Sequence, residues 1–154
     1  MTNARCMERI AAALASTLYS GYSPVAPGTV GAVVAALLLW YSGIDQGVPL
    51  LVLAVFVSLA GVWAGKRVEK IWGPDPGRFN WDEVAGMMVS LLFLPHTVPV
   101  FVLAFVAFRF FDIVKPFPVN RFEAFPHGWG IMGDDIMAGL YANIVVQILA
   151  RTVL

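Results

Sequence analysis

Long stretches without a charged residue constrain this chain more than any other feature of its sequence. Lys, Arg, Asp and Glu are absent over 35 consecutive residues at 10–44, over 20 at 46–65, over 25 at 84–108 and over 15 at 136–150. A membrane-spanning helix needs about 20 mostly apolar residues, a length that 46–65 reaches by itself. The sequence therefore predicts an integral membrane protein, with a soluble domain of very apolar helices as the alternative.

The composition excludes several other classes of protein. Hydrophobic residues make up 59% of the 154 residues and charged ones 13%, with ten basic and ten acidic side chains, whereas a soluble domain carries about 25% charged residues. A disordered tail and a nucleic-acid binder with a basic face are excluded. The single Cys6 cannot form an internal disulfide. The length favours one domain over residues 1–154.

Clusters of Pro and Gly divide the chain into helices, and no segment shows the alternation of a strand. We expect an all-α, polytopic membrane protein with about six helices, at 4–20, 29–42, 48–71, 80–94, 98–114 and 133–151. Glu8 and Arg9 interrupt any cleavable signal peptide. The first segment is instead expected to be a helix at or near the interface, because Met7, Ile10, Leu14 and Leu18 recur at helical spacing. The fourth and fifth form a short hairpin broken between Pro95 and Pro99, and whether it crosses the bilayer is left open.

The positions of Lys and Arg predict an orientation. Basic residues occur near the N-terminus, in 66–83 and in 109–135, whereas the turns at 43–49 and 95–99 contain none. Because positive loops stay on the cytoplasmic side, we expect both turns to face outward. Segments 29–42 and 48–65 would then form one hairpin, and most of the acidic residues would share the cytoplasmic side with most of the basic ones.

Two pairs of acidic residues each stand at the start of an apolar helix. Asp82 and Glu83 precede one charge-free segment, and Asp134 and Asp135 precede another. Acids in a first turn also suit the helix dipole, so a simple helix start is the alternative interpretation. Two such pairs on one side of a membrane could together hold Mg²⁺, which binds oxygen ligands and substrate phosphates.

Three further features bear on the chemistry. Arg109, Asp112 and Lys115 are spaced by three residues, which places neighbours on one helix face; a structural ion ladder is the alternative. The Gly-rich segment 21–31 leads into a helix, with Thr29 as the expected N-cap, and its free backbone N–H groups could bind an anion; a plain helix start is the alternative. His127 lies close to Asp134 in sequence and could act as a general acid or base, or be an incidental loop residue.

Four blocks in order resemble the phosphatidylglycerophosphatase A family. They are Ser23–Gly31, Asn80–Gly86, Arg109–Pro118 and Gly130–Gly139, within a resemblance that runs from about residue 20 to 145. The resemblance implies a Mg²⁺-dependent phosphatase of the bacterial inner membrane, with its site facing the cytoplasm. It would hydrolyse phosphatidylglycerophosphate to phosphatidylglycerol and phosphate in phospholipid biosynthesis. Residues 119–129 match the family less well, which leaves a role for His127 open.

A mechanism follows as a hypothesis. Mg²⁺ would be held by Glu83, Asp134 and Asp135, with Asp82 or Asp112 completing the set. Arg109 and Lys115 would bind the phosphate oxygens, and the helix start at Gly28, Thr29 and Gly31 would add backbone donors. Asp112 would orient the nucleophilic water or be the nucleophile itself.

The partners expected from this hypothesis are a phospholipid substrate and the membrane, with no nucleic acid. The competing hypothesis is a small membrane transporter that uses intramembrane carboxylates. A soluble or peripheral helical relative that lacks the chemistry is a third. The sequence leaves the oligomeric state, the number of metal ions and the headgroup preference open.

Overall fold

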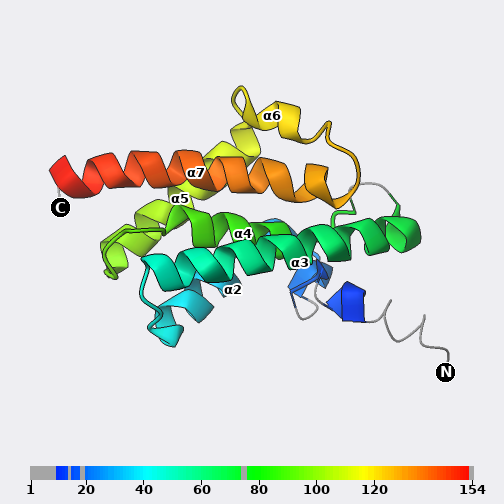
Figure 1. Ribbon diagram of the computed structural model, residues 1–154, viewed down its shortest axis with the longest axis horizontal. Coiled ribbons are helices and arrows are strands. Elements are labelled where there is room, and N and C mark those ends of the chain that lie inside the picture. The colour runs from blue at the N-terminus through cyan, green and yellow to red at the C-terminus, as the bar shows by residue number, and fades with distance from the viewer. Residues whose placement is uncertain (1–9, 14, 18–19, 74–75, 153–154) are drawn as a thin grey trace.

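The computed structural model describes residues 10–13, 15–17, 20–73 and 76–152, which form helices and connecting turns without a strand (Figure 1). This confirms the predicted all-α class. The elements are η1 (Ser20–Tyr22), α2 (Pro27–Ser42), α3 (Val48–Trp72), α4 (Trp81–Ser90), α5 (Val98–Val114), α6 (Val119–Phe122) and α7 (Gly128–Thr152). Of the helix expected at 4–20, residues 10–13 and 15 are helical; residues 1–9, 14, 18 and 19 lie outside the described part.

Proline sets where three of the long helices begin. Pro27, Pro49 and Pro99 occupy the first or second helical position of α2, α3 and α5, where the missing N–H costs no hydrogen bond. The prediction that Thr29 caps α2 is wrong, because the helix already begins at Pro27 and Ala26 stands at the cap position. The sequence also missed the short α6 and placed the start of α7 five residues too late, at 133 instead of Gly128.

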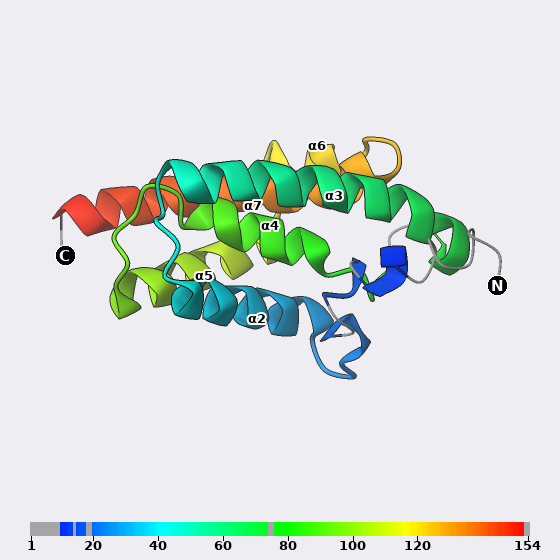
Figure 2. The ribbon, with the colours of Figure 1, turned by 60° about the horizontal axis from the view of Figure 1, so that its bottom comes forward.

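Helix α4 lies at the centre of the bundle. It packs against α7 most extensively and also against α2, α3 and α5, and nearly all of its side chains from Glu83 to Ser90 are buried. Figure 2 shows α4 between α2 and α3. The two segments expected to form a hairpin therefore run in opposite directions without packing closely along each other, because α4 separates them.

Two glycines allow α4 and α7 to cross at very short distance. A Cβ atom on Gly139 would collide with the backbone of Gly86, and one on Gly86 would collide with the ring of Phe108 and the backbone of Asp135. Only a residue without a side chain permits backbones to approach this closely. The crossing fixes the position of the residues about one turn before each glycine, which are the two acidic pairs.

The turns at the other end of the bundle lie together, as expected. The backbone N–H of Phe93 donates to the carbonyl of Gln46 at 2.6 Å, which links the turn after α4 to the turn before α3. Asn143 and Gln147 of α7 donate to the carbonyl of Leu92 at 2.8 and 3.2 Å. Both turns are therefore held at the end of the bundle opposite the acidic pairs.

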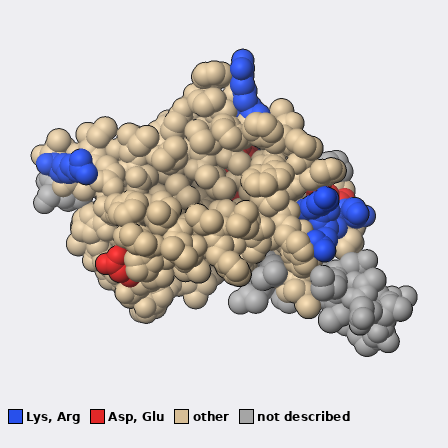
Figure 3. All heavy atoms as spheres, in the orientation of Figure 1, with Lys and Arg blue, Asp and Glu red and all other residues tan. Residues whose placement is uncertain are grey.

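Among the described residues, α3 is the one helix long and apolar enough to cross a membrane. Its 25 residues extend about 37 Å at 1.5 Å per residue, and only 33% of its most apolar 18-residue window is buried. Large apolar side chains such as Phe56, Leu38, Val102 and Ile144 are exposed on α3, α2, α5 and α7. Figure 3 shows a broad, mostly uncharged face on which the Lys and Arg side chains lie near the margins. With 10 residues, α4 is too short to cross a bilayer.

Candidate active site

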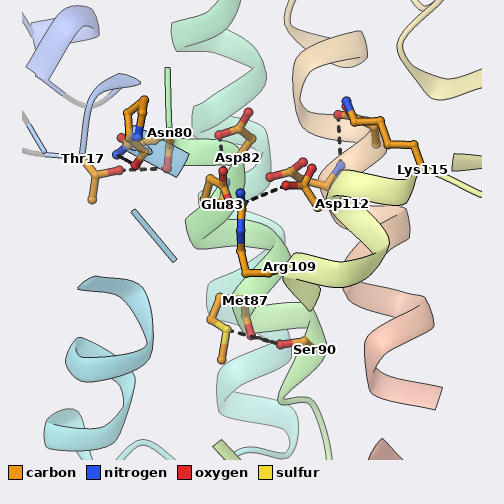
Figure 4. A network of polar contacts seen from close by, with 12 residues as sticks. Thr17, Asn80, Asp82, Glu83, Met87, Ser90, Arg109, Asp112 and Lys115 are labelled. Atoms are coloured by element: carbon orange, nitrogen blue, oxygen red, sulfur yellow. Dashed lines mark hydrogen bonds and ion pairs between the residues drawn. The ribbon is translucent and has the colours of Figure 1, made fainter. Parts of the chain in front are cut away.

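Three helices bring the acidic and basic side chains together at one end of the bundle (Figure 4). Helices α4 and α7 run in the same direction, and α5 runs in the opposite one (Figures 1 and 2). The start of α4, the end of α5 and the second turn of α7 therefore meet. The side chains that converge here are those of Asp82, Glu83, Arg109, Asp112, Lys115, Asp134 and Asp135. All seven were predicted as site residues.

Arg109 links α5 to α4. Its Nη1 forms ion pairs with Oε2 of Glu83 and, at 2.8 Å, with Oδ2 of Asp112, and Figure 4 shows the guanidinium between these two carboxylates. The three side chains are only 9–15% exposed. The Nε of Arg109 is buried and has no hydrogen-bond partner among the described residues. Arg109 therefore offers an unused donor inside the site.

Lys115 links the end of α5 to α7 and to the loop before it. Its backbone lies in the left-handed region at φ 45°, a conformation that non-glycine residues adopt at some cost and that often marks a functional site. Its Nζ contacts Oδ2 of Asp134 at 2.8 Å and also Oε1 of Glu123. The side chain of Glu123 is 51% exposed. Glu123 was missed as a site residue, because nothing in its local spacing sets it apart from a surface acid.

The acidic side chains are buried and repel one another. Burial, followed by the charges of neighbouring carboxylates, raises the pKa of Asp135 well above its ordinary value. Burial and the charge of Glu83 do the same to the pKa of Asp82. Burial raises the pKa of Glu83 to about 7, although Arg109 opposes the shift. The cluster is therefore short of positive charge, with five carboxylates facing two basic side chains.

This deficit fits a divalent cation. Oxygen donors are what Mg²⁺ prefers, and Oδ2 of Asp135 is buried without a hydrogen-bond partner in the described part of the chain. A bound cation would satisfy that oxygen and relieve the repulsion. Nevertheless, no three Asp, Glu, His or Cys side chains of the described residues already converge on one metal position. Arg109 and Lys115 hold Glu83 and Asp134, two of the three predicted ligands, in ion pairs instead.

The start of α2 reaches the same cluster. A Cβ atom on Gly28 would collide with the carboxylate of Glu83 and lie 3.3 Å from Nη1 of Arg109. The cap residue Ala26 makes no side-chain hydrogen bond to the helix start, and Thr29 lies in the first turn. Gly31 faces Asn80, whose Nδ2 would lie 2.8 Å from a Cβ there. Of the predicted glycines, Gly28 thus borders the acidic side chains and Gly31 borders Asn80.

Asn80 holds the start of α2 against the start of α4. Its buried Nδ2 donates to Oγ of Ser20 at 2.9 Å and to the carbonyl of Pro27 at 3.3 Å. The backbone carbonyl of Asn80 accepts a hydrogen bond from Oγ1 of Thr17 at 3.1 Å. The sequence assigned no role to Asn80, because its role in positioning these helices depends on residues that are distant in the chain.

A cavity of about 320 Å³ opens beside the cluster. It reaches Asp134 and is lined also by Glu123, His127 and Glu69. His127 lies in this cavity, but its Nδ1 contacts Oε2 of Glu69 at 3.3 Å, and its side chain is 63% exposed. His127 therefore lies near Asp134, as its position in the sequence suggested, but the carboxylate that it contacts is that of Glu69 on α3. The cavity thus reaches Asp134, whose Oδ2 contacts Nζ of Lys115.

Comparison with known proteins places these features in a family. The family model described as phosphatidylglycerophosphatase A matches residues 13–150. Proteins named phosphatidylglycerophosphatase A from Escherichia coli and Haemophilus influenzae are 40% and 37% identical over 125 and 134 residues, covering 79% and 82% of this chain and 72% and 80% of their own.

A relative with a different name is equally similar. A protein from Bacteroides thetaiotaomicron, provisionally named as a phosphatidylinositol-3-phosphatase, is 38% identical over 145 residues, which cover 84% of this chain and 86% of its own. No solved structure matches.

Proposed function

The chain belongs to the phosphatidylglycerophosphatase A family, and from that membership we propose that it hydrolyses phosphatidylglycerophosphate to phosphatidylglycerol and phosphate with the help of Mg²⁺. The observation that supports this most is the convergence of five carboxylates, Arg109, Lys115 and the start of α2 at one end of the bundle. A phosphate monoester needs both kinds of group, since its own charge requires cations and hydrolysis requires an activated nucleophile.

The residues that would hold Mg²⁺ are Glu83, Asp134 and Asp135, with Asp82 or Asp112 completing the set. When bound, Mg²⁺ neutralises phosphate charge and activates or orients a water molecule. Each of these side chains already lies in the cluster, and Oδ2 of Asp135 would lose no hydrogen bond to the described residues on binding the metal. If Arg109 and Lys115 bind the substrate phosphate in place of the carboxylates, Glu83 and Asp134 become available as metal ligands.

Arg109 and Lys115 bind the phosphate oxygens in this proposal. The buried Nε of Arg109 can donate without breaking a hydrogen bond to any described residue, which suits the two-pronged recognition of phosphate by arginine. Lys115 can leave the exposed Glu123 at little cost. Gly28 lets the start of α2, with its backbone donors, lie directly against Glu83 and Arg109, where the phosphate would bind.

Asp112 serves the nucleophile. Arg109 holds its Oδ2 at 2.8 Å and so fixes the direction of the carboxylate. Asp112 either accepts a proton from the attacking water, so that the bond from phosphorus to the glycerol oxygen breaks as the new one forms, or attacks phosphorus itself and breaks the same bond. In both routes the departing glycerol oxygen takes up a proton, and in the second route water then attacks phosphorus and frees both phosphate and Asp112. Acid quenching of a single turnover with substrate labelled in its phosphate group separates the two routes, because only the second route leaves label covalently bound to the protein.

The proposed location is the bacterial inner membrane, with the site facing the cytoplasm. The exposed apolar side of α3 supports insertion. The basic residues of 66–78 follow its apolar part and lie at the end of the bundle that carries the site, which is the pattern of a cytoplasmic end. The apolar faces of α2 and α5 favour several membrane-embedded segments. Acyl chains would remain among these helices while the headgroup reaches the cluster.

Phosphate release in detergent micelles tests the proposal. The purified chain is assayed with phosphatidylglycerophosphate and, because of the Bacteroides relative, with phosphatidylinositol 3-phosphate, each with Mg²⁺ or with a chelator. We expect Mg²⁺-dependent release, faster from phosphatidylglycerophosphate, and its loss in Asp134→Asn. The matched control is Asp45→Asn, which removes an acid whose carboxylate bonds the N–H of Gly47 near the opposite turns. Faster release from the inositol lipid would change the assigned headgroup.

The transporter hypothesis predicts a different outcome. Carboxylates that carry ions across a membrane stand partway along a span, whereas the acids found here lie at helix ends beside basic side chains. Phosphate release in micelles, where no sealed compartment exists, excludes a purely transporting role. The absence of release from both lipids would favour a transporter or a relative that has lost the chemistry.

A further inference from the structure

A groove separate from the acidic cluster lies along α3, beside the start of α7. It has a volume of about 520 Å³ and is lined by two tryptophans, Trp63 and Trp129, and three basic residues, Lys66, Arg67 and Lys70. It shares no lining residue with the cavity that reaches Asp134. The proposed reaction uses none of these side chains, so the groove needs another explanation.

The groove is built by the packing of α3 against α7. A Cβ atom on Gly65 would lie 2.9 Å from Cα of Gly128, so the helices are close here and Trp129 lies beside α3. Arg67 is oriented by its neighbour, because its guanidinium lies 3.9 Å from the ring centre of Trp63 and its Nη1 donates to the Trp63 carbonyl at 3.4 Å. The cation is therefore held in place before any ligand arrives.

The described residues that line the groove give it a positive charge. None of its lining residues is Asp or Glu, and the nearby Glu69 contacts His127 beside the other cavity. Lysine and arginine near a membrane surface attract anionic lipids, and tryptophan favours the level of the headgroups. An anion with an apolar part is the ligand that suits this combination.

The order of residues along α3 indicates which anion. The groove begins at the apolar Leu59 and Val62 and ends at Lys70, a distance of about 16 Å along the helix axis. If α3 crosses the bilayer, as proposed above, the apolar end lies among acyl chains and the basic end lies at the surface. A phospholipid has the same order of parts, whereas a free phosphate would leave the apolar half unused.

We propose that this groove binds an anionic phospholipid through its phosphodiester headgroup, at a site separate from the one that hydrolyses substrate. In Figure 3 a group of Lys and Arg side chains lies at the end of the molecule where Figure 1 shows the C-terminal end of α3. Bound lipid there would hold this end at the cytoplasmic surface. The inference rests on the proposed membrane location of the chain and is independent of the proposed hydrolysis.

Lipid binding to the full chain in a neutral detergent tests the inference. Affinity is measured by thermophoresis for phosphatidylglycerol with eight-carbon chains, for phosphatidylcholine of the same chain length and for inorganic phosphate. Lys66→Gln/Lys70→Gln removes two exposed charges from the groove, and adding Arg67→Gln removes the third. The matched control Arg78→Gln/Arg151→Gln removes two exposed charges elsewhere.

We expect phosphatidylglycerol to bind at least tenfold more tightly than phosphatidylcholine. The groove double variant should lose that preference, and the matched control should keep it. Equal binding by wild type and groove variants, or equal loss in the control, would overturn the proposal. Displacement of the lipid by inorganic phosphate at similar affinity would show a free-phosphate site instead. Phosphate release from substrate micelles should be unchanged in Lys66→Gln/Lys70→Gln, so loss of lipid binding and failure of the proposed hydrolysis are told apart.

Discussion

Replacing Asp135 by asparagine should stabilise the metal-free protein while removing its activity. Asp135 is 3% exposed, and its Oδ2 has no hydrogen-bond partner among the described residues. Asn has nearly the same shape but carries no charge, so Asp135→Asn relieves both the burial of that charge and its repulsion by the other carboxylates. An unsatisfied buried group costs about 1–3 kcal/mol. For a chain of this size each kcal/mol raises Tm by about 2–4 °C, so Tm should rise by about 2–12 °C.

Mg²⁺ should stabilise the wild type more than Asp135→Asn. A ligand present at 100 times its Kd stabilises the native state by about 2.7 kcal/mol, so saturating Mg²⁺ should raise the Tm of the wild type. Asp135→Asn should lose most of this increase, together with at least about 100-fold of the phosphate release, which corresponds to about 2.7 kcal/mol. Thermal unfolding in detergent with a chelator or with Mg²⁺ measures the first effect, and a phosphate assay measures the second.

The matched variant Asp45→Asn should change none of these quantities, because Asp45 lies near the opposite turns. If Asp135→Asn lowers Tm in the chelator and still responds to Mg²⁺ like the wild type, then Asp135 is a structural acid. The reasoning from its unpartnered oxygen would be refuted.

Three further predictions concern the glycines and the asparagine around the cluster. Gly28→Ala should displace Glu83 and lower kcat by about 100-fold with little change in Tm. The control Gly77→Ala, where a Cβ meets no described atom within 4 Å, should leave kcat unchanged, and equal kcat in the two variants would contradict the placement of α2. Gly139→Ala should cost about 1–3 kcal/mol of unfolding free energy through overpacking against α4, measured by chemical denaturation, and an unchanged midpoint would show that the helices can separate freely. Asn80→Ala should cost about 1–3 kcal/mol by leaving buried groups unpaired, and a proteolysis assay should show earlier cleavage before α2; unchanged proteolysis would argue against its positioning role.

Local features of the chain were predictable because they act within a few residues. The prolines at the start of α2, α3 and α5 are disfavoured in the interior of a helix, so they mark helix starts independently of the tertiary structure. The spacing of Arg109, Asp112 and Lys115 placed them on one side of α5, and the ion pairs of all three confirm that they face the cluster. The boundary errors at Thr29 and at the start of α7 arose where the sequence offered two acceptable helix starts.

Features that depend on distant residues could not be predicted in the same way. The contacts of Lys115 with Asp134 and Glu123, and of Asn80 with Ser20, join segments that no pattern in the chain relates. The insertion of α4 between α2 and α3 is another case, since neighbouring apolar segments normally pack on each other. It follows from a buried α4 that is apolar around most of its circumference and must be covered on several sides.

The sequence by itself determined a helical chain with long apolar segments and acid pairs at two helix starts, because charge, helix period and proline act locally. Only the tertiary structure decided that these pairs meet, since that depends on Gly86 and Gly139 lying at one crossing although they are far apart in the chain. It also decided which base faces which acid: Arg109 reaches Glu83 and Asp112, and Lys115 reaches Asp134. The physical reason is that side chains in a buried cluster take the partners that packing brings within reach.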